Sequence, residues 1–171
     1  GGSGTYQTLA NLPAKSYSLA AASYNGYIFV TGGNNGSTVL STVYSALVKA
    51  DGTIGPWTSL NTLPVVTFRH ASVAYNGYLF VLGGTYDGTT AVSTVYSAKI
   101  NSDGTIGTWA TLNTLAALRQ HLSAAAYNGY IFVTGGDISS SSAGTSTVYS
   151  AAILADGRIG TWQTLTVMPK R

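Results

Sequence analysis

The 171-residue sequence contains no cysteine and no glutamate, and charged residues of either sign make up only 8% of it. Without cysteine, disulfides and thiolate metal sites are impossible. A typical soluble domain has about 25% charged residues, whereas the formal net charge here is +3 and the eight lysines and arginines form no stripe. We therefore expect no nucleic-acid partner. No apolar run approaches the roughly 18 residues of a membrane span, so we expect no membrane partner either.

Helix-forming residues are also scarce, and strand and turn formers replace them. The chain has 21 glycines, 12 tyrosines and one methionine, and 45% of its residues are hydrophobic. This composition excludes a helical bundle or a coiled coil and favours an all-β fold with a sizeable core. The first four residues, 1–4, read Gly-Gly-Ser-Gly without a methionine, which we interpret as a linker or tag remnant.

Three motifs each occur three times along the chain, and the first of them recurs after 51 and then 52 residues. Tyr-Asn-Gly-Tyr-(Ile/Leu)-Phe-Val-x-Gly-Gly occurs at 24–33, 75–84 and 127–136. Ser-Thr-Val-Tyr-Ser-Ala occurs at 41–46, 93–98 and 146–151, and Asp-Gly-x-Ile-Gly-x-Trp occurs at 51–57, 103–109 and 156–162. Such a period is typical of propeller blades and solenoid repeats.

Each repeat predicts four short antiparallel strands, a to d. In the second repeat these are 72–75, 78–82, 93–98 and 107–112. Asn-Gly between strands a and b is the preferred type I′ hairpin turn, because both of its central positions need a positive φ. Asp-Gly provides the turn before strand d.

The order of Gly-Gly, Tyr, Trp and Leu-x-x-Leu-Pro resembles the kelch repeat over residues 5–171. The resemblance implies a kelch-type β-propeller arc of three four-stranded blades, at about 16–60, 67–112 and 119–165, with a tail at 166–171. The Arg-x-x-His step of the family is only partly present, as Arg119 and His70. The residues expected to build the blades are Gly32, Gly33, Trp57, Gly83, Gly84, Trp109, Gly135, Gly136 and Trp162.

The resemblance also bears on chemistry and origin. Kelch-type copper oxidases need a cysteine-linked tyrosine, which this chain cannot form. The sequence has no nucleophile–base pair and no phosphate or dinucleotide fingerprint. We therefore expect no enzymatic activity and no cofactor. Similarity to bacterial kelch repeats favours a secreted or cell-surface parent protein.

Three blades do not close a ring, because propellers usually have four to eight. The outer faces of the first and last blades would remain open, so we expect the chain to associate with itself. A homodimer would have six blades, and a trimer with nine is the alternative. The chain is interpreted as a fragment of a larger propeller or an engineered scaffold. Residues 5–9 repeat 161–165 as a redundant strand d, which either swaps onto a neighbouring copy or, as we favour, stays frayed.

The alternative function is a binding module for a protein, an acidic peptide or a glycan. The b–c loops are the only connections that vary in length, and the d–a connections vary in chemistry; both are expected on one rim of the propeller. The competing interpretation is that these side chains only bond neighbouring blades, and no spacing supports a metal site at the two histidines. The candidate rim residues are Tyr17, Phe68, Arg69, His70, Tyr86, Asp87, Arg119, His121 and Asp137.

Overall fold

The computed structural model describes residues 8–139, 143–165 and 168, which form strands and no helix. No helix that could cross a membrane is therefore present in this part of the chain. The strands are β1 (Ala20–Tyr24), β2 (Tyr27–Thr31), β3 (Val43–Leu47), β4 (Thr58–Ser59), β5 (Ala71–Tyr75), β6 (Tyr78–Leu82), β7 (Val95–Lys99), β8 (Ala110–Thr111), β9 (Ser123–Tyr127), β10 (Tyr130–Thr134), β11 (Val148–Ala152) and β12 (Gln163–Thr164).

The strands form three four-stranded antiparallel sheets, each in chain order, which we call blade 1 (β1–β4), blade 2 (β5–β8) and blade 3 (β9–β12). The predicted grouping into four-stranded units is confirmed. Asn76 and Gly77 have φ values of 49° and 79°, as a type I′ turn requires. The fourth strand is shorter than predicted: only Ala110 and Thr111 join the ladder of blade 2.

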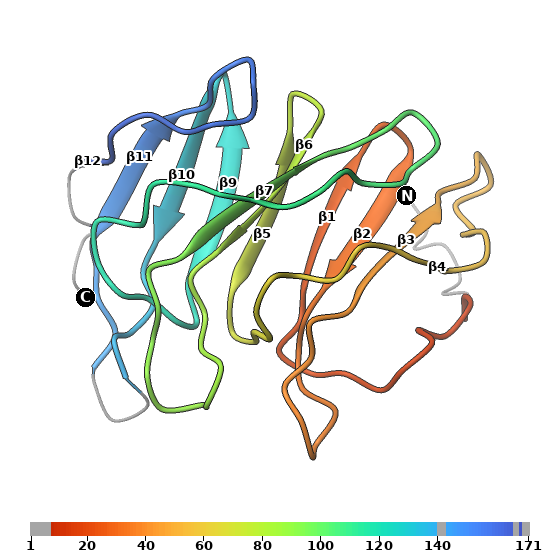
Figure 1. The fold of residues 1–171 in the computed structure, drawn as a ribbon, viewed down its shortest axis with the longest axis horizontal. Coiled ribbons are helices and arrows are strands. Elements are labelled where there is room, and N and C mark those ends of the chain that lie inside the picture. Colours follow the sequence, from red (N-terminus) through yellow and green to blue (C-terminus); the bar gives the residue numbers. More distant parts are fainter. Residues whose placement is uncertain (1–7, 140–142, 166–167, 169–171) are drawn as a thin grey trace, which may run out of the picture.

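The blades stand side by side as a fan, with β1 next to β5 and β5 next to β9 along its inner edge (Figure 1). This arrangement fits an arc of a β-propeller. Side chains alternate along each strand, so the middle blade buries both of its faces. On β6, Leu79 belongs to the core between blades 1 and 2, whereas Phe80 belongs to the core between blades 2 and 3.

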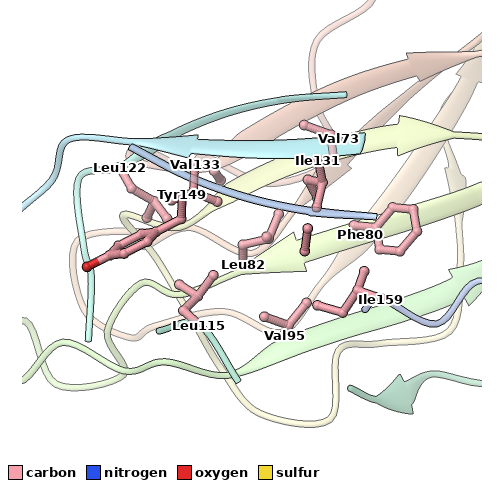
Figure 2. Packing of buried hydrophobic residues seen from close by; sticks show 12 residues of the cluster. Val73, Phe80, Leu82, Val95, Leu115, Leu122, Ile131, Val133, Tyr149 and Ile159 are labelled. Atoms are coloured by element: carbon pink, nitrogen blue, oxygen red, sulfur yellow. The ribbon is translucent and has the colours of Figure 1, made fainter. Parts of the chain in front are cut away.

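The core between blades 2 and 3 shows how two blade faces fit together (Figure 2). Phe80, Leu82 and Val95 of blade 2 pack against Ile131 and Val133 of blade 3. All five are at most 1% exposed. Removing this apolar area from water is the main stabilising contribution that the fold has available.

The Gly-Gly pairs let the backbone of one blade approach the connection that leads into the next. Gly83 has a φ of 60°, and a Cβ at this position would lie 2.5 Å from the Arg119 carbonyl oxygen. Gly84 N donates to the same oxygen at 2.8 Å. Only glycine combines the left-handed backbone with this close approach. In blade 3 the nearest atom to the same position of Gly135 is 3.6 Å away.

Two of the repeated tryptophans bond the segment before their own blade, and the buried Nε1 of the third, Trp162, has no hydrogen-bond partner among the described residues. Trp109 precedes β8, is partly exposed, and its Nε1 donates to the Asn61 carbonyl at 3.1 Å. Trp57 makes the equivalent bond to the Ala10 carbonyl at 3.2 Å. Residues 5–7 of the predicted redundant strand lie outside the described residues, and Thr8 and Leu9 belong to no strand.

Replacing Phe80 by alanine should destabilise the fold by about 3–5 kcal/mol, because the ring is fully buried between two blades. Urea unfolding at fixed protein concentration measures this change. Phe80→Leu, which keeps an apolar side chain, should cost less. A loss below about 1 kcal/mol for Phe80→Ala would contradict the packing of blade 2 on blade 3.

Candidate functional site

The candidate site is the rim, where the b–c loops of the blades meet the d–a connections. Single antiparallel bridges join the two kinds of segment in every blade. The bridged pairs are Tyr17 with Asn34, Phe68 with Thr85, and Gln120 with Asp137. The structure therefore brings the loops 34–40, 85–92 and 137–145, as far as it describes them, next to the connections 16–19, 67–70 and 119–122.

Three equivalent residues of the connections adopt left-handed backbone conformations. Ser18, Arg69 and His121 have φ values of 51°, 57° and 53°. Arg69 N donates to the Ser18 carbonyl at 2.9 Å, and His121 N donates to the Arg69 carbonyl at 2.8 Å. These two backbone hydrogen bonds link the connections of consecutive blades along the rim. Ser18 and Arg69 are residue types that do not favour this conformation, so the sequence carries no local signal for it at those two positions.

Arg69 is held by its own blade and the next one. Its guanidinium lies 4.8 Å from the Phe68 ring centroid and donates to the Gly88 carbonyl at 2.8 Å. A longer contact of 3.4 Å reaches Oε1 of Gln120, a fully buried residue that the sequence did not single out. The Phe68 ring is itself only 4% exposed, so this pair supports the b–c loop of blade 2.

Arg119 is buried, with 5% of its surface exposed. Its guanidinium donates to the Leu118 carbonyl at 2.8 Å, to Thr147 Oγ1 at 2.9 Å and to Tyr149 Oη at 3.2 Å. Its Cζ lies 5.5 Å from the Tyr149 ring centroid, within the range of a cation–π contact. The contacts with Thr147 and Tyr149 tie the connection into blade 3.

His70 is buried between blades 1 and 2. Its Nε2 lies 2.8 Å from Thr31 Oγ1, which in turn lies 2.7 Å from Ser72 Oγ. Burial lowers the pKa of the His70 imidazole to about 4, because the charged form loses its hydration. The ring is therefore neutral at pH 7 and does not provide a positive charge for an acidic ligand.

The two rim aspartates have different roles. Asp87 stabilises the turn of its own loop. Its Oδ1 accepts hydrogen bonds from the backbone N–H groups of Thr89 and Thr90, each at 2.8 Å. These bonds hold the pKa of the Asp87 carboxyl well below its usual range. Asp137 lies 2.9 Å from Nδ1 of His121 through its Oδ2. The buried Oδ1 of Asp137 has no hydrogen-bond partner among the described residues.

The candidate residues thus divide by exposure. Phe68, His70 and Arg119 are buried, and Arg69 is partly buried. Tyr17 and Tyr86 are 54% and 49% exposed, and the His121 side chain is 47% exposed. The exposed tyrosines can stack on a ligand, whereas the buried side chains make contacts inside the protein.

No group of three or more metal-ligating side chains occurs within residues 8–139, 143–165 and 168.

On the opposite rim, the aspartates of the Asp-Gly turns accept hydrogen bonds within those turns. Asp51 Oδ1 accepts from N and Oγ1 of Thr53 at 2.9 and 2.7 Å, and Asp103 does the same with Thr105 at 3.0 and 2.7 Å. The hydrogen bond from the threonine hydroxyl is the main cause that lowers the pKa of each of these two carboxyls.

One apolar hollow opens on the rim between blades 1 and 2, which we call the rim hollow. Its volume is about 200 Å³. Val65, Val66 and Thr67 line it from the d–a connection. The b–c loop and β7 of blade 2 complete the lining with Thr85, Tyr86, Val92, Thr94 and Tyr96.

Comparison with known proteins supports the fold but does not identify a family. No known family model matches the chain, so the kelch assignment stays a prediction. The solved structure of YjhT superimposes with a TM-score of 0.74 at 16% sequence identity, covering 94% of this chain and 54% of YjhT. Together with the three four-stranded sheets, this likeness fits a blade-type β-propeller.

A sequence relative is the Rho GTPase-activating protein gacHH of Dictyostelium discoideum, which is 32% identical over 84 residues. The match covers 49% of this chain and 5% of that protein. The chain therefore spans about half of YjhT and a small part of gacHH, and the activity of neither whole protein carries over.

Lowering the pH from 6.5 to 4 should destabilise the protein through His70. The unfolded chain takes up this proton near pH 6.5, whereas the folded chain does so only near pH 4. The unfolded state therefore binds more protons in this pH window. The free energy of unfolding should fall by an amount on the order of 3 kcal/mol. His70→Leu, with the residue found at the equivalent positions 19 and 122, should remove most of this loss.

Urea unfolding of the parent chain and of His70→Leu, each at pH 7.5 and 4.5, measures how the free energy of unfolding depends on pH. His121→Asn, which alters the other histidine and suits a left-handed backbone, should leave the contribution of His70 in place. An unchanged pH dependence in His70→Leu would show that His70 is not responsible.

Proposed function

We propose that this chain is a non-enzymatic propeller arc that completes a ring by associating with a second copy, blade 3 of each copy packing on blade 1 of the other. The observation that carries the proposal is that the two open faces repeat the two sides of the interfaces already formed inside the chain. The closed form would have six blades.

The open face of blade 3 repeats the face that blades 1 and 2 bury. Phe29 and Phe80 are fully buried against the following blade, whereas their equivalent Phe132 is partly exposed. In the same way, Val43 and Val95 are at most 1% exposed, and their equivalent Val148 is not fully buried. The apolar side chains are present, but no further blade covers them within the described part of the chain.

The open face of blade 1 repeats the other side of the same interface. Leu79 and Ile131 are fully buried against the preceding blade, whereas the equivalent Ile28 is partly exposed. Val48 is 42% exposed, against 7% for its equivalent Ile100. The two open faces are therefore different from each other and complementary, as a head-to-tail contact requires.

A tyrosine and a glycine show the same complementarity in detail. A Cβ on Gly104 would collide with the ring of Tyr27, and one on Gly157 would collide with the ring of Tyr78, so each tyrosine lies on the Asp-Gly turn of the next blade. The third such tyrosine, Tyr130, is 47% exposed. The third such glycine, Gly52, has no atom within 4 Å of its Cβ position. In the ring, Tyr130 would lie on Gly52 of the second copy.

Two copies are favoured over three because this chain matches about half of the YjhT chain, which shares its fold. Where blade 3 of one copy meets blade 1 of the other, residues 161–165 of the first copy and residues 5–9 of the second would compete for the position of the fourth strand of blade 3. The proposal assigns that place to 161–165, which carry the larger Trp162 where the other segment has Tyr6.

The test is sedimentation or native mass spectrometry over a range of concentrations. We expect a species of twice the 17.6 kDa chain mass. Ile28→Asp and Phe132→Asp should each give a monomer, because each places a charge on one open face. Ser102→Asp, on an exposed turn of blade 2, is the control and should stay dimeric. A parent chain that stays monomeric at every concentration would contradict the proposal.

Mixing the two monomeric variants tests the head-to-tail geometry. Each variant keeps one intact face, so an equimolar mixture should recover the dimer mass through a single interface. If two blade 1 faces packed on each other instead, Phe132→Asp alone would remain dimeric, and this outcome would contradict the ring.

Rim binding of a glycan or an acidic peptide remains the second candidate. The exposure of Tyr17 and Tyr86 favours stacking on a sugar or an aromatic group. The burial of Arg119 and the neutral state of His70 favour the glycan over the acidic peptide. A glycan screen in which Tyr17→Ala and Tyr86→Ala weaken the strongest ligand would support this function.

A further inference from the structure

The rim hollow has a counterpart between blades 2 and 3, and there an arginine side chain fills it. The guanidinium of Arg119 donates to the Leu118 carbonyl, Thr147 Oγ1 and Tyr149 Oη at 2.8, 2.9 and 3.2 Å. It also lies against the Tyr149 ring, with Cζ 5.5 Å from the centroid. In Figure 2 the hydroxyl of Tyr149 points away from the other labelled apolar side chains.

The groups that receive this guanidinium are repeated one blade earlier. In the alignment of the repeats, Val66, Thr94 and Tyr96 stand where Leu118, Thr147 and Tyr149 stand in the next blade. All three line the rim hollow. The arginine position itself holds Thr67, whose short side chain makes only a 3.5 Å contact with the Gly83 carbonyl. The rim hollow is the space that an arginine would fill.

The acceptors in the rim hollow are unused. Within the described part of the chain, the hydroxyls of Thr94 and Tyr96 make no hydrogen bond, whereas their counterparts accept from Arg119. The Tyr96 side chain is 8% exposed, as Tyr149 is. The opening is bordered by Val65, Val66 and Tyr86, which are 48%, 38% and 49% exposed, so a group from solvent can enter.

We infer that the rim hollow binds the guanidinium of an arginine side chain presented by a peptide. A guanidinium suits it better than an ammonium, because a guanidinium is planar, weakly hydrated and able to lie on an aromatic face. Valine walls cannot replace the hydration of a lysine ammonium. The site lies between two blades of one chain and goes beyond the proposed ring closure, so it does not require a second copy.

The test is an NMR titration of the full chain with N-acetyl-arginine amide. We expect saturable shifts at Thr94 and Tyr96, and binding at least threefold weaker in Tyr96→Phe, which loses one acceptor and keeps the ring. Thr67→Arg supplies the guanidinium from the chain and should abolish the shifts. Thr67→Ser is the matched control, because it keeps the space open and should bind as the parent chain does.

One neutral probe and one non-planar cation test the chemistry. N-acetyl-citrulline amide has nearly the same shape without the charge, and N-acetyl-lysine amide has the charge without the plane; both should bind at least threefold more weakly. The inference is overturned if no saturable shift appears, if citrulline or lysine binds equally well, or if folded Thr67→Arg still binds the arginine probe.

Discussion

A sheet of this kind has two apolar faces, and each can be buried only against another sheet. In the middle blade both faces are covered, and Leu79, Phe80, Val81 and Leu82 are at most 1% exposed along a single strand. The outer blades have the same alternation but one neighbour each. The arc is therefore a repeated interface with one half left open at each end. That constraint gives the proposed ring closure its physical basis, since hydrophobic burial favours covering such surfaces.

Close packing of neighbouring blades also depends on glycine at places where the backbone of one blade meets the next. Gly83 faces the Arg119 carbonyl, and the turn glycines Gly104 and Gly157 face tyrosine rings. The equivalent glycines of the outer faces, Gly52 and Gly135, meet no neighbouring blade within one chain. Their φ values of 79° and 63° favour glycine at both positions in any case.

The rim shows how a few substitutions in a repeated frame change its chemistry. At one position the three repeats have Ser16, Thr67 and Arg119. Arginine fills its site and joins the connection to blade 3, whereas threonine leaves a hollow with the same acceptors around it. Most of the rim's cations serve contacts of this internal kind. The exposed tyrosines and the rim hollow are the parts left for a ligand.

The repeats, the strand order and the turns follow from the sequence alone, because they depend on neighbours a few residues apart. Asn76-Gly77 specifies its hairpin locally, and the unbroken apolar run 78–82 indicates a strand buried on both faces. The same sequence did not reveal that Arg119 and His70 are buried, or that Arg69 and His121 adopt left-handed conformations. Arg119 contacts Tyr149, His70 contacts Thr31 and Arg69 bonds Ser18, and these partners lie 30 to 51 residues away along the chain. Strand pairing within a blade and the packing of one blade on the next bring these residues together, so only the tertiary structure could decide which rim residues face solvent and which are held in internal contacts.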